Sequence, residues 1–553
     1  MKPLLKKTIK TVVPNKLIHA AIRHRNRPVE HQQIKPTSVN GEGSKQNTSA
    51  KLNQNLHYGS DFLTTDWLVE QLKARAPESV KVWFYHKSFG ARLSICVLNS
   101  NVRLMIDAII ELSYYASLDI KILVAKEWHT PKSYEDLLYT VRKQNFSNIE
   151  LSGSDRVLKF RIEQWRQEDG VLNAPRDNLY TRRIYLQNLG AGRDFLSEPG
   201  RNLSELFPDP IEDDLTFPID LVYTWVNSQD PDWQELYAEF APTEDADDED
   251  GADVQSEEDV LLQKTQDITP HGTADRYENR DELRYSLRSI EKFAPWVRNI
   301  YVFTNCKPPA WVDTSNPRLK WIYHKEVFEP KNLPTFSSHA IETQLHKLPN
   351  LSERFIYFND DIVFTRPANP QHFFQPNGLA RIRLEDYGMV HGNVEEDAPD
   401  YLNAARNVQA LLIRRFGKTV TQLHTHTPQS MIKSVVENAE TDFAENYAYT
   451  ASQRFRSQGD ISPSSFLYPH YAYLSGNAIK SSFPSMLIKS SINYENAFKS
   501  VLSNIGQDNE NGPLTVCIND GGGSAMNENW NVEVENFLMK AFPDLSQFEK
   551  AIE

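Results

Sequence analysis

Short apolar runs alternate with amphipathic stretches in the second half of the chain. Each run ends in polar residues, and a short apolar run of this kind predicts a buried strand. The runs are residues 219–226, 299–304, 319–323 and 355–358. Between them, 280–293 has helical periodicity, and Ser337 or Ser338 can cap a further helix that runs to about Lys347. Strands that alternate with helices pair in parallel, so this pattern predicts an α/β fold with a Rossmann-like sheet.

The first half of the chain has a similar texture between residues 59 and 205. Apolar runs at 80–85, 93–97 and 119–124 predict strands, and 102–116 predicts a helix. None of these elements carries a catalytic pattern, so we expect an accessory α/β domain. A turn-rich stretch at 197–218 marks its end. The expected organisation is a basic segment with a linker (1–58), the accessory domain (59–205) and a catalytic domain (206–553).

Two charged segments change this picture. Residues 1–27 carry eight Lys and Arg and no acid, with apolar residues at near-helical spacing up to Pro14 and beyond. Such a segment is typical of a helix on an anionic membrane surface, although a disordered basic tail has the same composition. Residues 244–259 hold ten carboxylates, which account for most of the net charge of −14 and predict a disordered loop at about 242–262.

Composition excludes several classes of protein. No run approaches the roughly 18 apolar residues of a membrane span, and the basic start lacks the apolar core of a secretory signal. Cys96, Cys306 and Cys517 are too widely spaced for a disulfide framework or a zinc site, so a reducing cytosol is expected. The acidic chain has no basic stripe with aromatics, which argues against nucleic acid as a partner.

The strongest chemical pattern is Asn359-Asp360-Asp361, which directly follows the predicted strand 355–358. Open α/β sheets bind their ligands at the carboxyl ends of strands. Adjacent carboxylates point to opposite faces of an extended segment, so one can hold a metal or act as a base while the other braces the loop. A capped strand end followed by a polar turn is the alternative.

Three further polar clusters follow strand ends or lie in loops: residues 223–233, residues 424–429 with 454–456 further on, and residues 517–521. Each has a structural alternative, such as an Asx turn or a hydrogen-bonded histidine. His424 and His426 would share one face of a strand as a metal pair, although Pro428 makes a regular strand doubtful. Carboxylates, His and Arg without a nucleophilic Ser or Cys favour phosphoryl transfer, and a glycosidase carboxylate pair stays open.

The chain lacks a Gly-x-Gly-x-x-Gly turn after its first catalytic strand and lacks a Walker lysine loop. Longer ordered motifs, however, resemble the Stealth family. The first region matches at 219–227, the second at 276–290, 294–300, 333–338 and 359–361, the third from Arg406 through His426 to Arg456, and the fourth at 517–521 and 528–531. The resemblance covers about 219–549 and leaves the first 200 residues unmatched.

The Stealth family comprises hexose-1-phosphate transferases, including bacterial capsule polymerases and the animal enzyme that begins mannose-6-phosphate tagging of lysosomal hydrolases. The resemblance implies a bacterial, meningococcal-type polymerase. Such an enzyme transfers N-acetylhexosamine-1-phosphate or hexose-1-phosphate from a UDP-sugar, typically UDP-N-acetylhexosamine, to a hydroxyl of the growing capsular oligosaccharide, and releases UMP. It also implies a cytoplasmic protein on the inner face of the membrane, beside the capsule assembly and export machinery.

Candidate roles follow for individual residues. Asp360 and Asp361 are candidates for binding Mg²⁺ (or Mn²⁺) or for receiving the hydroxyl proton, and Asn519 and Asp520 could complete the metal shell. His426 could act as general base or donate a hydrogen bond to a phosphate oxygen, and Arg456 could neutralise the developing charge. By resemblance, both residues match active-site positions of the family. The candidates for holding the donor are Asn227, Asp230, Arg280, Asn403 and Arg406. Gln429 and Ser430 replace the second histidine of a His-x-Pro-His pattern of some relatives, which weakens a metal role there.

Two other classes of function stay open at this point. A conventional glycosyltransferase would break the sugar C1–O bond and release UDP. A non-catalytic glycan-binding protein would release no nucleotide.

Overall fold

The computed structural model describes a large part of the chain, in two compact units that divide between Asp213 and Asp214. The described residues are 65–75, 82–86, 93–153, 157–178, 181–185, 201–202, 209–240, 279–491, 493–506, 512–520, 524 and 527–550. The basic segment at 1–27, the linker at 28–58 and the acidic loop at 242–262 lie outside them.

The N-terminal unit is a mixed sheet with three described helices, α3 (Thr65–Arg75), α4 (Val102–Tyr115) and α5 (Tyr134–Lys143). The strand order is β4-β3-β5-β6-β2-β1-β9, and β7 and β8 extend from β6. The strands are β1 (Val82–His86), β2 (Leu93–Leu98), β3 (Asp119–Val124), β4 (Glu127–His129), β5 (Phe146–Ser152), β6 (Val157–Glu168), β7 (Val171–Asn173), β8 (Arg183–Tyr185) and β9 (Arg201–Asn202). The predicted strands and helix of this region are confirmed to within a few residues.

The C-terminal unit is built on a five-stranded sheet of order β12-β11-β10-β13-β16. Its strands are β10 (Ile219–Trp225), β11 (Ile300–Thr304), β12 (Leu319–Tyr323), β13 (Arg354–Asn359) and β16 (Gln429–Ile432). The first four are parallel and β16 is antiparallel. Every residue of β11 is buried, as expected for a strand covered on both faces.

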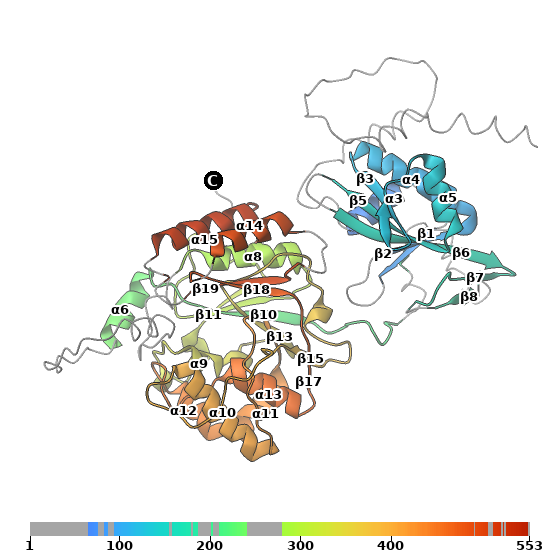
Figure 1. Cartoon of the computed structure of the whole chain (residues 1–553). Coiled ribbons are helices and arrows are strands. Elements are labelled where there is room, and N and C mark those ends of the chain that lie inside the picture. The colour runs from blue at the N-terminus through green and yellow to red at the C-terminus, as the bar shows by residue number, and fades with distance from the viewer. Residues whose placement is uncertain are drawn as a thin grey trace, which may run out of the picture. The chain divides into compact units, whose positions relative to one another are not determined.

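Helices cover both faces of this sheet (Figure 1). One layer contains α8 (Glu282–Phe293), α14 (Tyr494–Asn504) and α15 (Glu528–Ala541), and the other contains α9 (Ser338–Glu342), α10 (Asp400–Phe416), α11 (Lys433–Asp442), α12 (Ala444–Ala451) and α13 (Tyr468–Leu474). α6 (Pro231–Phe240) follows β10. The predicted α/β class and the parallel pairing are therefore confirmed.

Two small sheets and one helix break were not predicted. β14 (Ile362–Phe364), β18 (Ser485–Lys489) and β19 (Thr515–Asn519) form one small sheet, and β15 (Ala380–Ile382) pairs with β17 (Ala478–Lys480) in the other. Ser337 caps α9 as expected, but α9 ends at Glu342, before a separate turn at Leu345–Lys347. The Thr343 hydroxyl donates to the Ala340 carbonyl (2.6 Å), which competes with the helical backbone pattern.

Candidate active site

A cavity of about 750 Å³ opens at the carboxyl ends of β10 and β13. β10 lies between β11 and β13, so the strand order reverses between β10 and β13. Such a reversal leaves a crevice in which open α/β sheets bind ligands. Thr224 of β10 is opposite Asn359 of β13 and both line the cavity. The sequence therefore placed Asn359-Asp360-Asp361 at the correct edge of the sheet.

Carboxylates gather on this side of the cavity. Asp360, Asp361, Glu282 and Asp520 all line it. Burial, followed by the nearby charges of Glu282 and Asp361, raises the pKa of Asp360 well above its usual range. Burial also raises the pKa of Asp361 to about 7. A hydrogen bond from the Cys517 thiol (3.2 Å) acts in the opposite direction and lowers this pKa. The other oxygen of Asp361, Oδ1, is buried without a hydrogen-bond partner.

Arg280 does not line the cavity but contacts two of these carboxylates. Its Nη1 donates to Glu282 Oε1 (3.1 Å) and to Asp520 Oδ2 (2.7 Å), and its Nε donates to Asn531 Oδ1 (2.8 Å). Asp520 Oδ1 accepts from Trp530 Nε1 (3.1 Å). One buried guanidinium thus faces a cluster of carboxylates that it does not neutralise completely, and the remaining negative charge favours a cation.

Cationic and imidazole groups form another part of the lining, which contains His426, Arg456 and Lys489. Arg456 Nη2 donates to Ser338 Oγ (2.7 Å), which fixes the guanidinium next to the start of α9. Burial and the charge of Lys489 lower the pKa of His426, so its imidazole is neutral at pH 7 and can accept a proton. Asp360, Asp361, His426, Arg456, Asn519 and Asp520 therefore share one cavity, as the sequence analysis expected.

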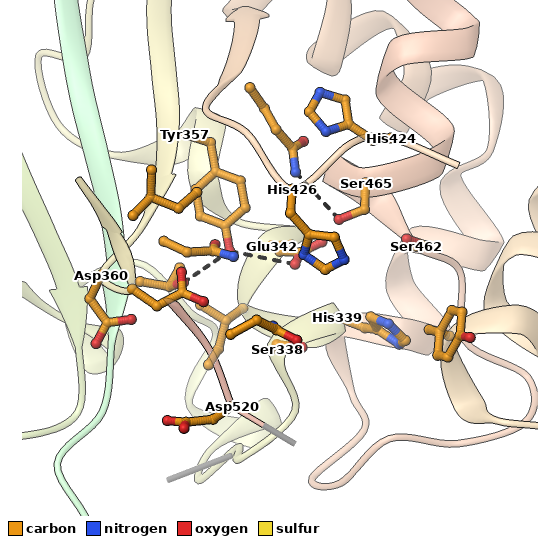
Figure 2. A pocket seen from close by; sticks show the side chains of 18 of the residues that line it. Ser338, His339, Glu342, Tyr357, Asp360, His424, His426, Ser462, Ser465 and Asp520 are labelled. Carbon is orange, nitrogen blue, oxygen red and sulfur yellow. Dashed lines mark hydrogen bonds between the residues drawn. The ribbon is translucent and has the colours of Figure 1, made fainter. Parts of the chain in front are cut away.

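Several lining residues were missed by the sequence analysis. Glu342 of α9 accepts from the Tyr357 hydroxyl (3.5 Å) and from the Ser464 backbone (3.2 Å), and Tyr357 also contacts the Thr224 hydroxyl (2.9 Å). Figure 2 shows Tyr357, Glu342 and His426 near the middle of the view, with Asp360 and His339 on opposite sides. In the sequence, the capping Ser337 predicts the helix on which Glu342 lies, but no pattern indicates that Glu342 faces the cavity.

His339 and Asp460 form a buried pair beside Arg456. His339 Nδ1 lies 3.3 Å from Asp460 Oδ2, which also accepts from the Ser457 backbone (3.0 Å). Burial raises the pKa of Asp460 to about 7. The pair connects α9 with the turn that carries Arg456. It could not be predicted from the sequence, because its two residues are far apart along the chain.

His424 and His426, considered as a possible metal pair, do not share the face of a strand. His424 makes an isolated bridge to Leu384, and its Nδ1 lies 2.5 Å from the Thr425 carbonyl. Burial, then the charge of Arg383, lowers the pKa of His424 to about 3. Within the ranges that the structure describes, no three His, Cys, Asp or Glu side chains form a metal cluster by themselves.

The five candidates for holding the donor do not line the cavity. Asp230 accepts from the backbone of Asp232 (3.0 Å) and Lys307 (2.7 Å), and Asn227 Oδ1 accepts from the Gln229 backbone (3.0 Å). Arg280 binds carboxylates as described above, and Asn403 and Arg406 bind each other (3.0 Å). Contact of these residues with a donor stays a prediction.

Models of three Stealth conserved regions match the chain: region 1 at 217–244, region 2 at 276–382 and region 3 at 425–473. Region 2 contains Asp360 and Asp361, and region 3 contains His426 and Arg456. Arg406, which we expected at the start of region 3, lies outside that match.

Curated relatives agree with this result. The capsular polysaccharide phosphotransferase SacB of Neisseria meningitidis serogroup A is 35% identical over 94% of this chain and 92% of its own length. The exopolysaccharide phosphotransferase SCO6021 of Streptomyces coelicolor is 36% identical over 70% of each chain. Among solved structures, the galactosyltransferase LgtC matches 49% of this chain and 94% of its own at 11% identity, with a TM-score of 0.27. The three conserved regions and the nearly full-length match to SacB show that the chain belongs to the Stealth family.

Proposed function

We propose that the protein is a capsule polymerase that transfers N-acetylhexosamine-1-phosphate from a UDP-sugar to a hydroxyl of a growing capsular oligosaccharide. One observation carries the proposal: a single cavity at the β10/β13 edge joins a carboxylate cluster to Arg456, His426 and Lys489. Phosphoryl transfer needs this combination of charge neutralisation and positioning, and it needs no protein nucleophile. The names of the curated relatives, capsular and exopolysaccharide phosphotransferases, support the same activity.

The reaction joins the acceptor hydroxyl oxygen to the β-phosphorus and breaks the bond between that phosphorus and the oxygen bridging to UMP. His426 is the proposed acceptor of the hydroxyl proton, since its lowered pKa keeps the imidazole neutral. Arg456, held by Ser338, stabilises the charge on the equatorial oxygens, as a fixed guanidinium suits phosphate. UMP leaves, and each new link is a phosphodiester.

The carboxylate cluster suits Mg²⁺ (or Mn²⁺) because hard oxygen donors are its preferred ligands. Asp361 has a buried oxygen without a partner, and we propose that it holds the ion with Asn519 and Asp520 while Asp360 supports the loop. Mg²⁺ is commonly held by one or two carboxylates together with substrate phosphates, so a complete protein cage is not required. Such an ion would neutralise the donor diphosphate.

The nucleotide product tests this function. The protein incubated with a UDP-N-acetylhexosamine and a short capsular primer is expected to release UMP in step with chain growth, as measured by anion-exchange chromatography. UDP as the product would instead support a conventional glycosyltransferase. Absence of both nucleotides across a panel of UDP-sugars would support a glycan-binding role.

We also propose a location at the inner face of the cytoplasmic membrane, beside the capsule assembly and export machinery. None of the helices in the described ranges is long and apolar enough to cross a membrane. The basic amphipathic pattern of residues 1–27 supports binding to anionic lipid headgroups. Deleting residues 1–27 is expected to weaken co-sedimentation with anionic vesicles and to leave turnover of a soluble primer unchanged. Equal sedimentation of both forms would contradict this location.

A further inference from the structure

We propose that Tyr387 and Tyr401 form the acceptor subsite, in which their rings stack on the apolar face of a sugar near the end of the growing chain. This inference rests on the proposed function, and it names the part of the cavity that binds the glycan rather than the donor. Both residues line the cavity that contains Asp361 and His426.

Both side chains are partly exposed within the cavity. Tyr387 is 57% exposed and Tyr401 is 40% exposed, although large apolar side chains are generally buried. They come from different segments, the loop after β15 and the first turn of α10, and both reach one cavity. Exposed aromatic rings within a cavity are typical of a binding site.

The Tyr387 loop is held firmly in place. The backbone of Glu385 donates to Leu423 (2.9 Å), and the backbone of Met389 donates to Thr421 (2.8 Å), on either side of Tyr387. Gly388 packs so closely that a Cβ atom there would lie 2.7 Å from the Thr421 hydroxyl oxygen. The segment that holds the loop continues directly into His426, so the backbone at Tyr387 has a fixed place relative to the proposed base.

Asn403 and Arg406 hold the start of α10, which carries Tyr401. Asn403 is fully buried, donates to the Glu395 carbonyl (2.6 Å) and accepts from the Glu395 backbone (3.1 Å). Arg406 donates to Asn403 Oδ1 (3.0 Å) and to the His391 carbonyl (3.0 Å). These two residues therefore fix the start of α10 to the loop before it. We infer that they are positioning residues, which hold the helix turn that carries Tyr401.

The chemistry of this wall fits a sugar better than a nucleotide diphosphate. Glu385, two residues before Tyr387, also lines the cavity. A carboxylate accepts hydrogen bonds from sugar hydroxyls and repels phosphate, so this wall suits a sugar ring of the acceptor rather than a phosphate of either substrate. A pyranose presents C–H groups on one face, which pack on the electron-rich face of an aromatic ring while the hydroxyls stay in water. The cationic residues Arg456 and Lys489 offer the diphosphate a separate place in the same cavity.

The test uses Tyr387→Ala and Tyr401→Ala in the full-length protein. Short N-acetylhexosamine-1-phosphate oligomers of the gluco, galacto and manno series serve as acceptors, and binding is also followed by saturation-transfer NMR without a donor. Each variant is expected to raise the KM for the oligomer at least about fivefold. We expect kcat, the KM for the UDP-sugar and the affinity for UDP to change less than about twofold, since the rings contact neither the donor nor the reacting atoms.

Two further variants separate stacking from a structural effect. Tyr387→Phe is expected to keep the wild-type KM because the ring remains. Tyr473→Ala removes a tyrosine of α13 that lies outside the cavity lining and whose exposure (44%) is between those of Tyr387 and Tyr401. An unchanged oligomer KM in both alanine variants, or a loss of UDP affinity instead, would overturn the proposal. So would failure of all three oligomer series to bind the wild-type protein. Oligomer binding is scored without turnover, so release of UDP in place of UMP would refute the proposed function alone.

Discussion

Replacing Asp361 with asparagine is expected to lower UMP release by about 10³-fold or more while the thermal stability stays equal or rises. Asn preserves the size of the side chain but removes the negative charge that Mg²⁺ binding requires. Stability should not fall, because Asp361 lies in a like-charge cluster with Asp360, Glu282 and Asp520 that raises its pKa to about 7. Turnover at a series of Mg²⁺ concentrations and a melting curve give both results.

Asp544→Asn is the matched control, because Asp544 is an exposed carboxylate of the same unit that does not line the cavity. It is expected to leave both activity and melting temperature unchanged. An Asp361→Asn variant with more than about a tenth of normal turnover at saturating Mg²⁺ would remove Asp361 from the proposed metal shell.

Arg280→Ala is expected to destabilise the C-terminal unit by about 3–5 kcal/mol, because it leaves buried carboxylates without their counter-charge. The Arg280 side chain is 3% exposed and binds both Glu282 and Asp520. Loss of this ion pair would also release Asp520, so activity should fall with stability. Urea unfolding followed by tryptophan fluorescence measures the change in the free energy of unfolding.

A surface pair provides the control for this prediction. Arg415 is 50% exposed and pairs with Asp442 (2.7 Å) between α10 and α11. An exposed pair contributes at most about 1 kcal/mol, so Arg415→Ala should change stability little. Arg280→Ala could instead be no more destabilising than Arg415→Ala and only weaken donor binding. That result would support the donor contact predicted from the sequence and contradict a stabilising role for Arg280.

The fold was predictable because its signals are local. Runs such as 319–323 are apolar, short and bounded by polar residues, and alternation with helices fixed the parallel pairing. The small sheet of β14, β18 and β19 was not predictable in this way. It pairs β14 with β19, which lies more than 100 residues further along the chain, and no local pattern records such pairing.

The grouping of residues at the candidate site was predictable where polar residues follow a strand end. Asp360 and Asp361 come directly after β13, and the sheet edge determines what they face. Asn403 and Arg406 are also polar, yet their contacts with the loop before α10 depend on tertiary structure. Tyr387 gave no signal at all, because an aromatic residue in a loop is distinguished only by its exposure within a cavity.

The most direct test of the central claim follows the oxygen atom that joins the sugar to the β-phosphate. A UDP-N-acetylhexosamine labelled with ¹⁸O at this anomeric oxygen is incubated with the protein, Mg²⁺ and a primer, and both products are analysed by mass spectrometry. Sugar-1-phosphate transfer keeps the C1–O bond, so the label is expected in the phosphodiester of the polymer, with unlabelled UMP released. Label in released UDP, with none in the polymer, would contradict the account.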